Sequence, residues 1–78
     1  MKNDFNEKLG IYIRLRRERF NLTQGDVAKT LGVDRSTYAH YEIGDRVMSA
    51  NMLYKISQLL KFEVNAFYDY YELSGKEK

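Results

Sequence analysis

The sequence contains no cysteine, no proline, no tryptophan and only one histidine. Without cysteine no disulfide can stabilise a small fold, and without a cluster of cysteine and histidine there are no ligands for a structural zinc ion. There is also no glycine-rich phosphate loop and no Gly-x-Ser-x-Gly turn, so the usual parts of nucleophilic and metal-assisted catalysis are missing. We therefore expect neither an enzyme nor a protein with a metal, a cofactor or a small-molecule ligand.

Long apolar runs are missing as well. No stretch approaches the roughly 20 apolar residues that a bilayer-spanning helix needs. The first twenty residues interleave charged and apolar side chains, unlike the apolar core of a signal peptide. We expect a cytoplasmic protein with no membrane partner. At 78 residues the chain is expected to form one domain, residues 1–73, followed by a short polar tail, residues 74–78.

Neither sign of charge predominates, because 13 Lys and Arg residues are nearly balanced by 11 Asp and Glu residues. The resulting net charge of +2 is too small to indicate a polyanionic partner by itself.

Apolar residues recur at helical spacing, which predicts an all-α fold. The expected helices are residues 4–20, 23–31, 34–42, 49–61 and 65–73.

Capping residues support these boundaries. Thr23 with Asp26 forms a predicted capping box at the start of the second helix, and Asp34 and Ser49 are predicted to cap the third and fourth. The residues predicted to end helices in a left-handed conformation are Asn21, Gly32 and Gly44. The residues predicted to share the buried face of the first helix are Phe5, Leu9, Ile13 and Phe20.

The second and third expected helices are short and are joined by Gly32 and Val33, with small Ala28 where the two helices approach each other. This arrangement is typical of a helix-turn-helix. Residues 22–33 (LTQGDVAKTLGV), followed by residues 41–44 (YEIG), resemble the phage-repressor and Cro-like family, which includes the Xre-type bacterial regulators. The resemblance covers nearly the whole chain. It implies a five-helix, lambda-repressor-like DNA-binding domain.

The resemblance also implies roles for individual residues. It makes the third helix the recognition helix, with base-reading positions at Arg35, Ser36, Ala39 and His40. It places phosphate-contacting positions at Thr23, Gln24, Ile43 and Arg46. It implies an internal salt bridge between Arg17 and Glu42. Four residues depart from the family's usual pattern, namely Arg16, Asn21, Ile43 and Asp45.

The chemistry of these side chains agrees with base reading. Arg35 can donate two hydrogen bonds to guanine, and Ala39 can contact a thymine methyl group. His40 can donate or accept, although a lone histidine can equally be an ordinary surface residue. Tyr38 and Tyr41 lie on the other side of the helix and are expected in the core.

The fifth expected helix is rich in aromatic residues, with four in the five residues 67–71. They cannot all face inward on one short helix, so some are expected to be exposed or covered by a second subunit. We expect a homodimer interface formed by Phe67, Tyr70 and Tyr71. The alternative is a local cluster packed against the first helix.

Together these features predict a sequence-specific double-stranded DNA-binding transcriptional regulator, a dimeric repressor that reads a palindromic operator through the third helix. The alternative is a helical protein-interaction module, antitoxin-like or regulator-binding, with little DNA contact. Phosphate contacts make DNA affinity fall steeply with salt, so salt dependence distinguishes the two functions.

Overall fold

Residues 4–76 are described by the computed structural model, with side chains through residue 73, and they form five helices and no strand. The helices are α1 (Asp4–Arg19), α2 (Gln24–Leu31), α3 (Arg35–Ile43), α4 (Ala50–Leu59) and α5 (Val64–Lys76). The predicted all-α fold is therefore confirmed. Helix α5 continues past its predicted end at residue 73, so residues 74–76 of the predicted tail are helical, while residues 77–78 lie outside the described part. None of the five helices is both long and apolar enough to span a bilayer.

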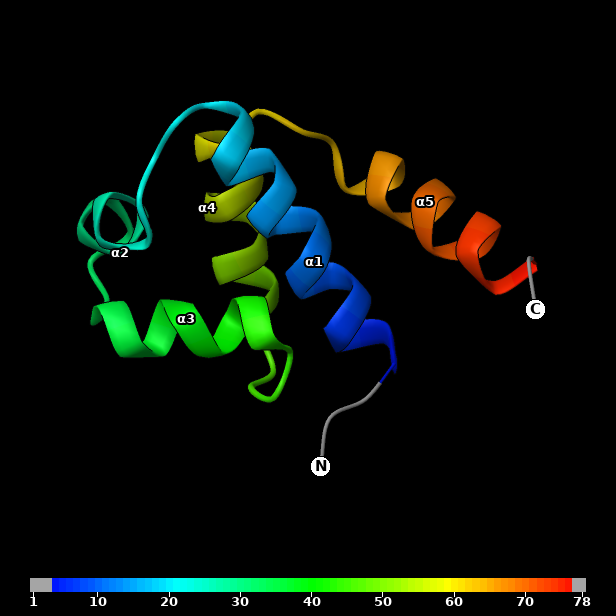
Figure 1. Cartoon of the computed structure of the whole chain (residues 1–78), viewed down its shortest axis with the longest axis horizontal. Helices are drawn as coiled ribbons and strands as arrows, with labels where there is room; N and C mark the ends of the chain where they lie inside the picture. The colour runs from blue at the N-terminus through cyan, green and yellow to red at the C-terminus, as the bar shows by residue number, and fades with distance from the viewer. Residues whose placement is uncertain (1–3, 77–78) are drawn as a thin grey trace.

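Helix α1 runs through the middle of the arrangement (Figure 1). Helices α2 and α3 lie on one side of α1, and α5 lies on the other. Helix α3 packs on both α1 and α2 and follows one edge of the molecule, so that one of its faces is free for solvent or a ligand.

Two of the three predicted helix caps form side-chain hydrogen bonds. The Thr23 hydroxyl accepts a bond from the backbone N–H of Asp26 (3.0 Å), and the Thr23 N–H donates to the Asp26 carboxylate (2.9 Å), which completes the capping box. These bonds lower the pKa of Asp26. The Ser49 hydroxyl accepts from the N–H of Met52 in the same way. Asp34 stands at the N-cap of α3 with extended backbone, but its side chain makes no capping bond.

The connections between helices depend on residues whose backbone adopts the left-handed conformation, with positive φ. The predicted left-handed conformation is confirmed for Asn21 (φ 57°), Gly32 (φ 75°) and Gly44 (φ 88°). A fourth such residue, Lys61 (φ 57°), follows α4 and was not expected, because lysine carries no sequence signal for this conformation.

The core lies where the five helices meet, with buried side chains from each of them. Its fully buried large side chains are Tyr38, Phe67, Ile13, Ile56, Leu60 and Val27. The expected burial of Tyr38 and Tyr41 is confirmed. The prediction for Phe20 is wrong: its side chain lies beyond the last turn of α1, is 38% exposed, and has the Arg16 guanidinium 5.6 Å from its ring centroid.

Phe67, one of the three residues expected to form a homodimer interface, is instead buried within its own chain. Phe67 is 1% exposed, and its ring centroid lies 5.3 Å from that of Phe5 and 5.6 Å from that of Tyr12, both on α1. Tyr71 packs edge-on against Phe5, and Tyr70 packs against Tyr12. The aromatic residues therefore form the local cluster against α1 that was the alternative. They attach α5 to its own chain.

Helices α1 and α3 approach so closely that no side chain fits between them at residue 10. A Cβ atom on Gly10 would overlap with the carbonyl oxygen of Glu42 and would lie 2.7 Å from that of Tyr41. A Cβ atom on Gly44 would lie 2.6 Å from the Cα of Glu7, also on α1. Two glycines therefore fix the distance between α1 and the C-terminal end of α3.

We expect Gly10→Ala to lower the free energy of unfolding by about 1–3 kcal/mol, because the added methyl group forces two backbones apart. Gly25→Ala is the matched control. A Cβ atom there would meet only ordinary contacts, at 3.7 Å from Thr23 Oγ1 and 3.9 Å from Arg35 Cδ, and alanine favours a helix. Chemical denaturation of both variants checks this prediction. Equal stability of Gly10→Ala and the wild type would show that the helices can separate at no cost.

Candidate nucleic-acid interface

The outer face of α3 carries all four predicted base-reading residues. Arg35 and Ser36 are exposed, and Ala39 and His40 are partly exposed one turn further along. Residues spaced in this way share one side of a helix. The opposite side, with Tyr38, is buried in the core. The structure therefore brings the four residues together on the free edge of the molecule.

The turn between α2 and α3 fixes the orientation of α3 relative to α2, and therefore the direction in which this face of α3 points. Gly32 donates its backbone N–H to the Lys29 carbonyl (3.2 Å), and Val33 donates to the Ala28 carbonyl (3.0 Å). Ala28 is 3% exposed, and the Val33 side chain packs against the core. The carbonyls at the end of α2 are thereby satisfied, and α3 starts at a fixed point.

A hydrogen-bonded network behind α3 connects it to α1 and α2. The predicted Arg17–Glu42 pair is present: Arg17 Nε donates to Glu42 Oε2 (2.6 Å) and Nη2 donates to Oε1 (3.1 Å). Gln24 Nε2 also donates to Glu42 Oε1 (3.0 Å), and Arg17 Nη1 donates to the Leu22 carbonyl (2.9 Å). One carboxylate therefore binds side chains from two other helices.

Burial and hydrogen bonding act in opposite directions on Glu42. Burial alone raises the pKa of its carboxyl group, but the bonds from Arg17 and then the neighbouring Tyr38 and Gln24 outweigh burial, so the pKa is lowered. The Tyr38 hydroxyl is itself buried without a partner in hydrogen-bonding geometry. Its burial, followed by the nearby Glu42 carboxylate, raises the pKa of Tyr38. The network is thus ionised at Glu42 and neutral at Tyr38.

The predicted phosphate-contacting residues fall into two groups. Thr23 and Gln24 lie at the N-terminus of α2, where backbone N–H groups attract anions, but both side chains already make bonds within the protein. Ile43 and Arg46 lie at and after the C-terminus of α3, and both are exposed. An isoleucine side chain has no donor for a phosphate oxygen, so Ile43 can offer only apolar contact.

The sequence from residue 10 to residue 73 matches the model of a family described as a helix-turn-helix domain. The match covers most of the chain and includes α2 and α3. The chain belongs to this family. Compared with curated proteins, it shows no match. Membership indicates a DNA-binding regulator, a class of protein that is typically not enzymatic.

One contact beside the predicted base-reading residues was not expected from the sequence. His40 Nδ1 lies 2.8 Å from Asp45 Oδ1, and both side chains are partly exposed. In the sequence, Asp45 stood out only as a departure from the family's usual pattern. The sequence offered no signal for the pair, because the turn at Gly44 decides whether residue 45 returns towards the helix.

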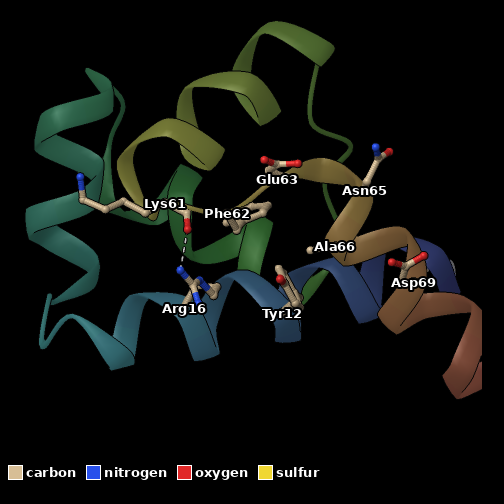
Figure 2. A pocket seen from close by; sticks show the side chains of 8 residues that line it. All are labelled: Tyr12, Arg16, Lys61, Phe62, Glu63, Asn65, Ala66 and Asp69. Carbon is tan, nitrogen blue, oxygen red and sulfur yellow. Dashed lines mark hydrogen bonds between the residues drawn. The ribbon is translucent and has the colours of Figure 1, made fainter.

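Arg16 departs from the usual helix-turn-helix pattern for a structural reason. Its guanidinium donates to the carbonyl oxygens of Leu60 (3.1 and 3.2 Å) and Lys61 (2.6 Å), where α4 ends. Cations are favourable at helix C-termini. Figure 2 shows Arg16 reaching the Lys61 carbonyl across a groove between α1 and the start of α5. The groove lies away from α3, and Arg16 stabilises the fold there.

Proposed function

We propose that the protein is a sequence-specific transcriptional regulator that places α3 in the major groove of double-stranded DNA. The observation that supports this most is the outer face of α3, which combines a fork-shaped donor, a hydroxyl, a methyl and an imidazole on one side of a short helix. These groups match the donors, acceptors and methyl groups that base edges present in the major groove. The buried network around Glu42 supports the proposal, because base reading needs a helix held at a fixed angle.

Phosphate contacts would orient the domain on the duplex. Arg46 follows the C-terminus of α3. The N-terminus of α2, with Thr23 and Gln24, lies near the start of α3, because a Cβ atom built on Gly25 would be 3.9 Å from Arg35 Cδ. We assign Arg46 a charged contact and Ile43 an apolar contact with the sugar or a thymine methyl group. The net charge of only +2 favours a modest number of phosphate contacts.

We further propose a homodimeric repressor of the phage-repressor type that binds a palindromic operator. One recognition helix contacts only a few base pairs, which is too little to stand out among the roughly 10⁶ or more competing sites in a genome. Two copies related by a two-fold axis would bind half-sites about one helical turn, ~34 Å, apart. The exposed apolar side chains that α5 offers to a second copy are Tyr68 and Leu73, because Phe67 is buried in its own chain.

The experiment that tests this function is selection of DNA fragments by the pure protein, followed by affinity measurements on the best site. Arg35→Ala is expected to weaken binding to that site by about 1–3 kcal/mol and to relax preference at one base pair, because a bidentate contact to guanine is lost. The matched control is Arg19→Ala, which removes an exposed arginine from α1. We expect the control to leave base preference unchanged.

Two results would contradict the proposal. Equal weakening on every sequence would make Arg35 a phosphate contact instead of a base contact. Wild-type affinity for DNA no better than background at low salt would favour the protein-interaction module, since phosphate contacts are strongest under that condition.

A further inference from the structure

The His40–Asp45 pair lies at the C-terminal end of the recognition face and is held by a rigid turn. His40 is in the last turn of α3, and Gly44 ends that helix in the left-handed region. Because Gly44 packs directly on the backbone of α1, the turn has little room to move. Asp45 follows it, and its carboxylate oxygen lies 2.8 Å from His40 Nδ1.

The chemistry of this contact decides which ring nitrogen carries the proton. An ionised carboxylate only accepts hydrogen bonds, so His40 Nδ1 must carry the hydrogen that it donates to Asp45. In a neutral ring the other nitrogen, Nε2, is then left with a lone pair and acts as an acceptor. Without Asp45 the proton is free to move to Nε2, which would turn the same nitrogen into a donor.

We propose that Asp45 is a specificity-determining residue that acts through His40. By fixing the Nδ1–H tautomer it makes His40 Nε2 an acceptor for an exocyclic amino group, which cytosine (N4) and adenine (N6) present in the major groove. This inference rests on the proposed DNA-binding function. It gives α3 two complementary ends, with the donors of Arg35 at its start and the acceptor of His40 near its finish.

The charge of Asp45 supports a specific role. A carboxylate beside the reading face repels DNA phosphates and lowers affinity for every sequence. Asp34, at the other end of α3, carries the same charge, makes no capping bond and lies six positions before His40. Asp34→Ala is therefore a charge-matched control that leaves the His40–Asp45 contact intact.

The tautomer can be measured without DNA, because the chain has one histidine and its ring nitrogens give unambiguous ¹⁵N signals. At a pH at which those spectra show a neutral ring, the wild type and Asp34→Ala are expected to hold the proton on Nδ1. Asp45→Ala is expected to shift it towards Nε2. A wild-type ring protonated on Nε2, or a tautomer unchanged by Asp45→Ala, would overturn the inference.

The second measurement compares base preference among the same variants on selected DNA. Asp45→Ala is expected to reduce the preference for an amino-bearing base at one position by about three- to tenfold. Asp34→Ala is expected to raise affinity for all sequences and leave that preference intact. In a His40→Ala background, Asp45→Ala should change the preference no further, because the residue through which it acts is gone.

Failure of this inference is distinguishable from failure of the proposed function. A wild type without any sequence preference overturns the proposed function, and the inference falls with it. A wild-type preference that Asp45→Ala and Asp34→Ala affect in the same way overturns the inference alone, since Asp45 would then contribute only its charge. Melting temperatures of all variants confirm that each is folded.

Discussion

Replacing Glu42 with glutamine is expected to lower the free energy of unfolding by about 3–5 kcal/mol. The side chains of Glu42 and Arg17 are only 4% and 12% exposed, so the change leaves a guanidinium inside the protein without its counter-charge. For a domain of this size each kcal/mol shifts the melting temperature by roughly 4–8 °C. Thermal unfolding at neutral pH measures the effect directly. An unchanged melting temperature would show that water reaches the pair in solution.

The double variant Arg17→Met, Glu42→Gln is the matched control. Removing both charges leaves no unpaired ion in the interior, so the double variant is expected to be more stable than Glu42→Gln alone. If the two substitutions destabilised additively, the pair would contribute nothing as a pair. The comparison separates loss of the ion pair from loss of packing around Gln24 and Tyr38.

The same carboxylate should make stability depend on pH. Because the folded state lowers the pKa of Glu42, its contribution is complete above the unfolded value of about 4.3. The contribution is then lost as pH falls through the lowered folded value. We expect the wild type to lose stability as the pH falls below about 4.3, and Glu42→Gln to lose less over the same range. Parallel curves for the two proteins would contradict this expectation.

Local signals in the sequence predicted much of this fold. The Thr23 capping box and the Gly32 turn depend on residues within four positions of each other, so the sequence alone carries the information. The Arg17–Glu42 pair joins residues 25 positions apart, and it was predicted only through the resemblance to a known family. A contact between residues far apart in the sequence can therefore be predicted when the family that the sequence resembles contains the same contact.

Contacts that depend on how helices dock could not be predicted in this way. Gly10 and Arg16 each meet residues more than 30 positions away, on α3 and at the end of α4. The direction of Phe67 depends on which side of α5 faces α1, which four closely spaced aromatic residues leave ambiguous. The His40–Asp45 pair is short-range, but it depends on the exact path of the turn between the two residues.

The buried position of Phe67 leads to the second large effect. Phe67→Ala is expected to destabilise the fold by about 3–5 kcal/mol, because it removes a fully buried ring from the contact between α5 and α1. The matched variant is Tyr68→Ala, one residue further along the same helix. Its side chain is 45% exposed, so we expect a change of less than about 1 kcal/mol. Chemical denaturation of both variants, monitored by circular dichroism, provides the comparison.

The difference in burial between Phe67 and Tyr68 determines which variants can test for a dimer. A variant that lacks Phe67 is expected to be strongly destabilised, so its loss of association could result from unfolding instead of a changed subunit interface. Sedimentation of Tyr68→Ala and Leu73→Ala, which change exposed residues of α5 and should stay folded, tests that helix instead. Dissociation of these variants would place the interface on the outer side of α5, whereas normal dimers would move it elsewhere. If Phe67→Ala kept the wild-type melting temperature and became monomeric, the aromatic cluster would be an intermolecular contact after all, and its packing on α1 would be wrong.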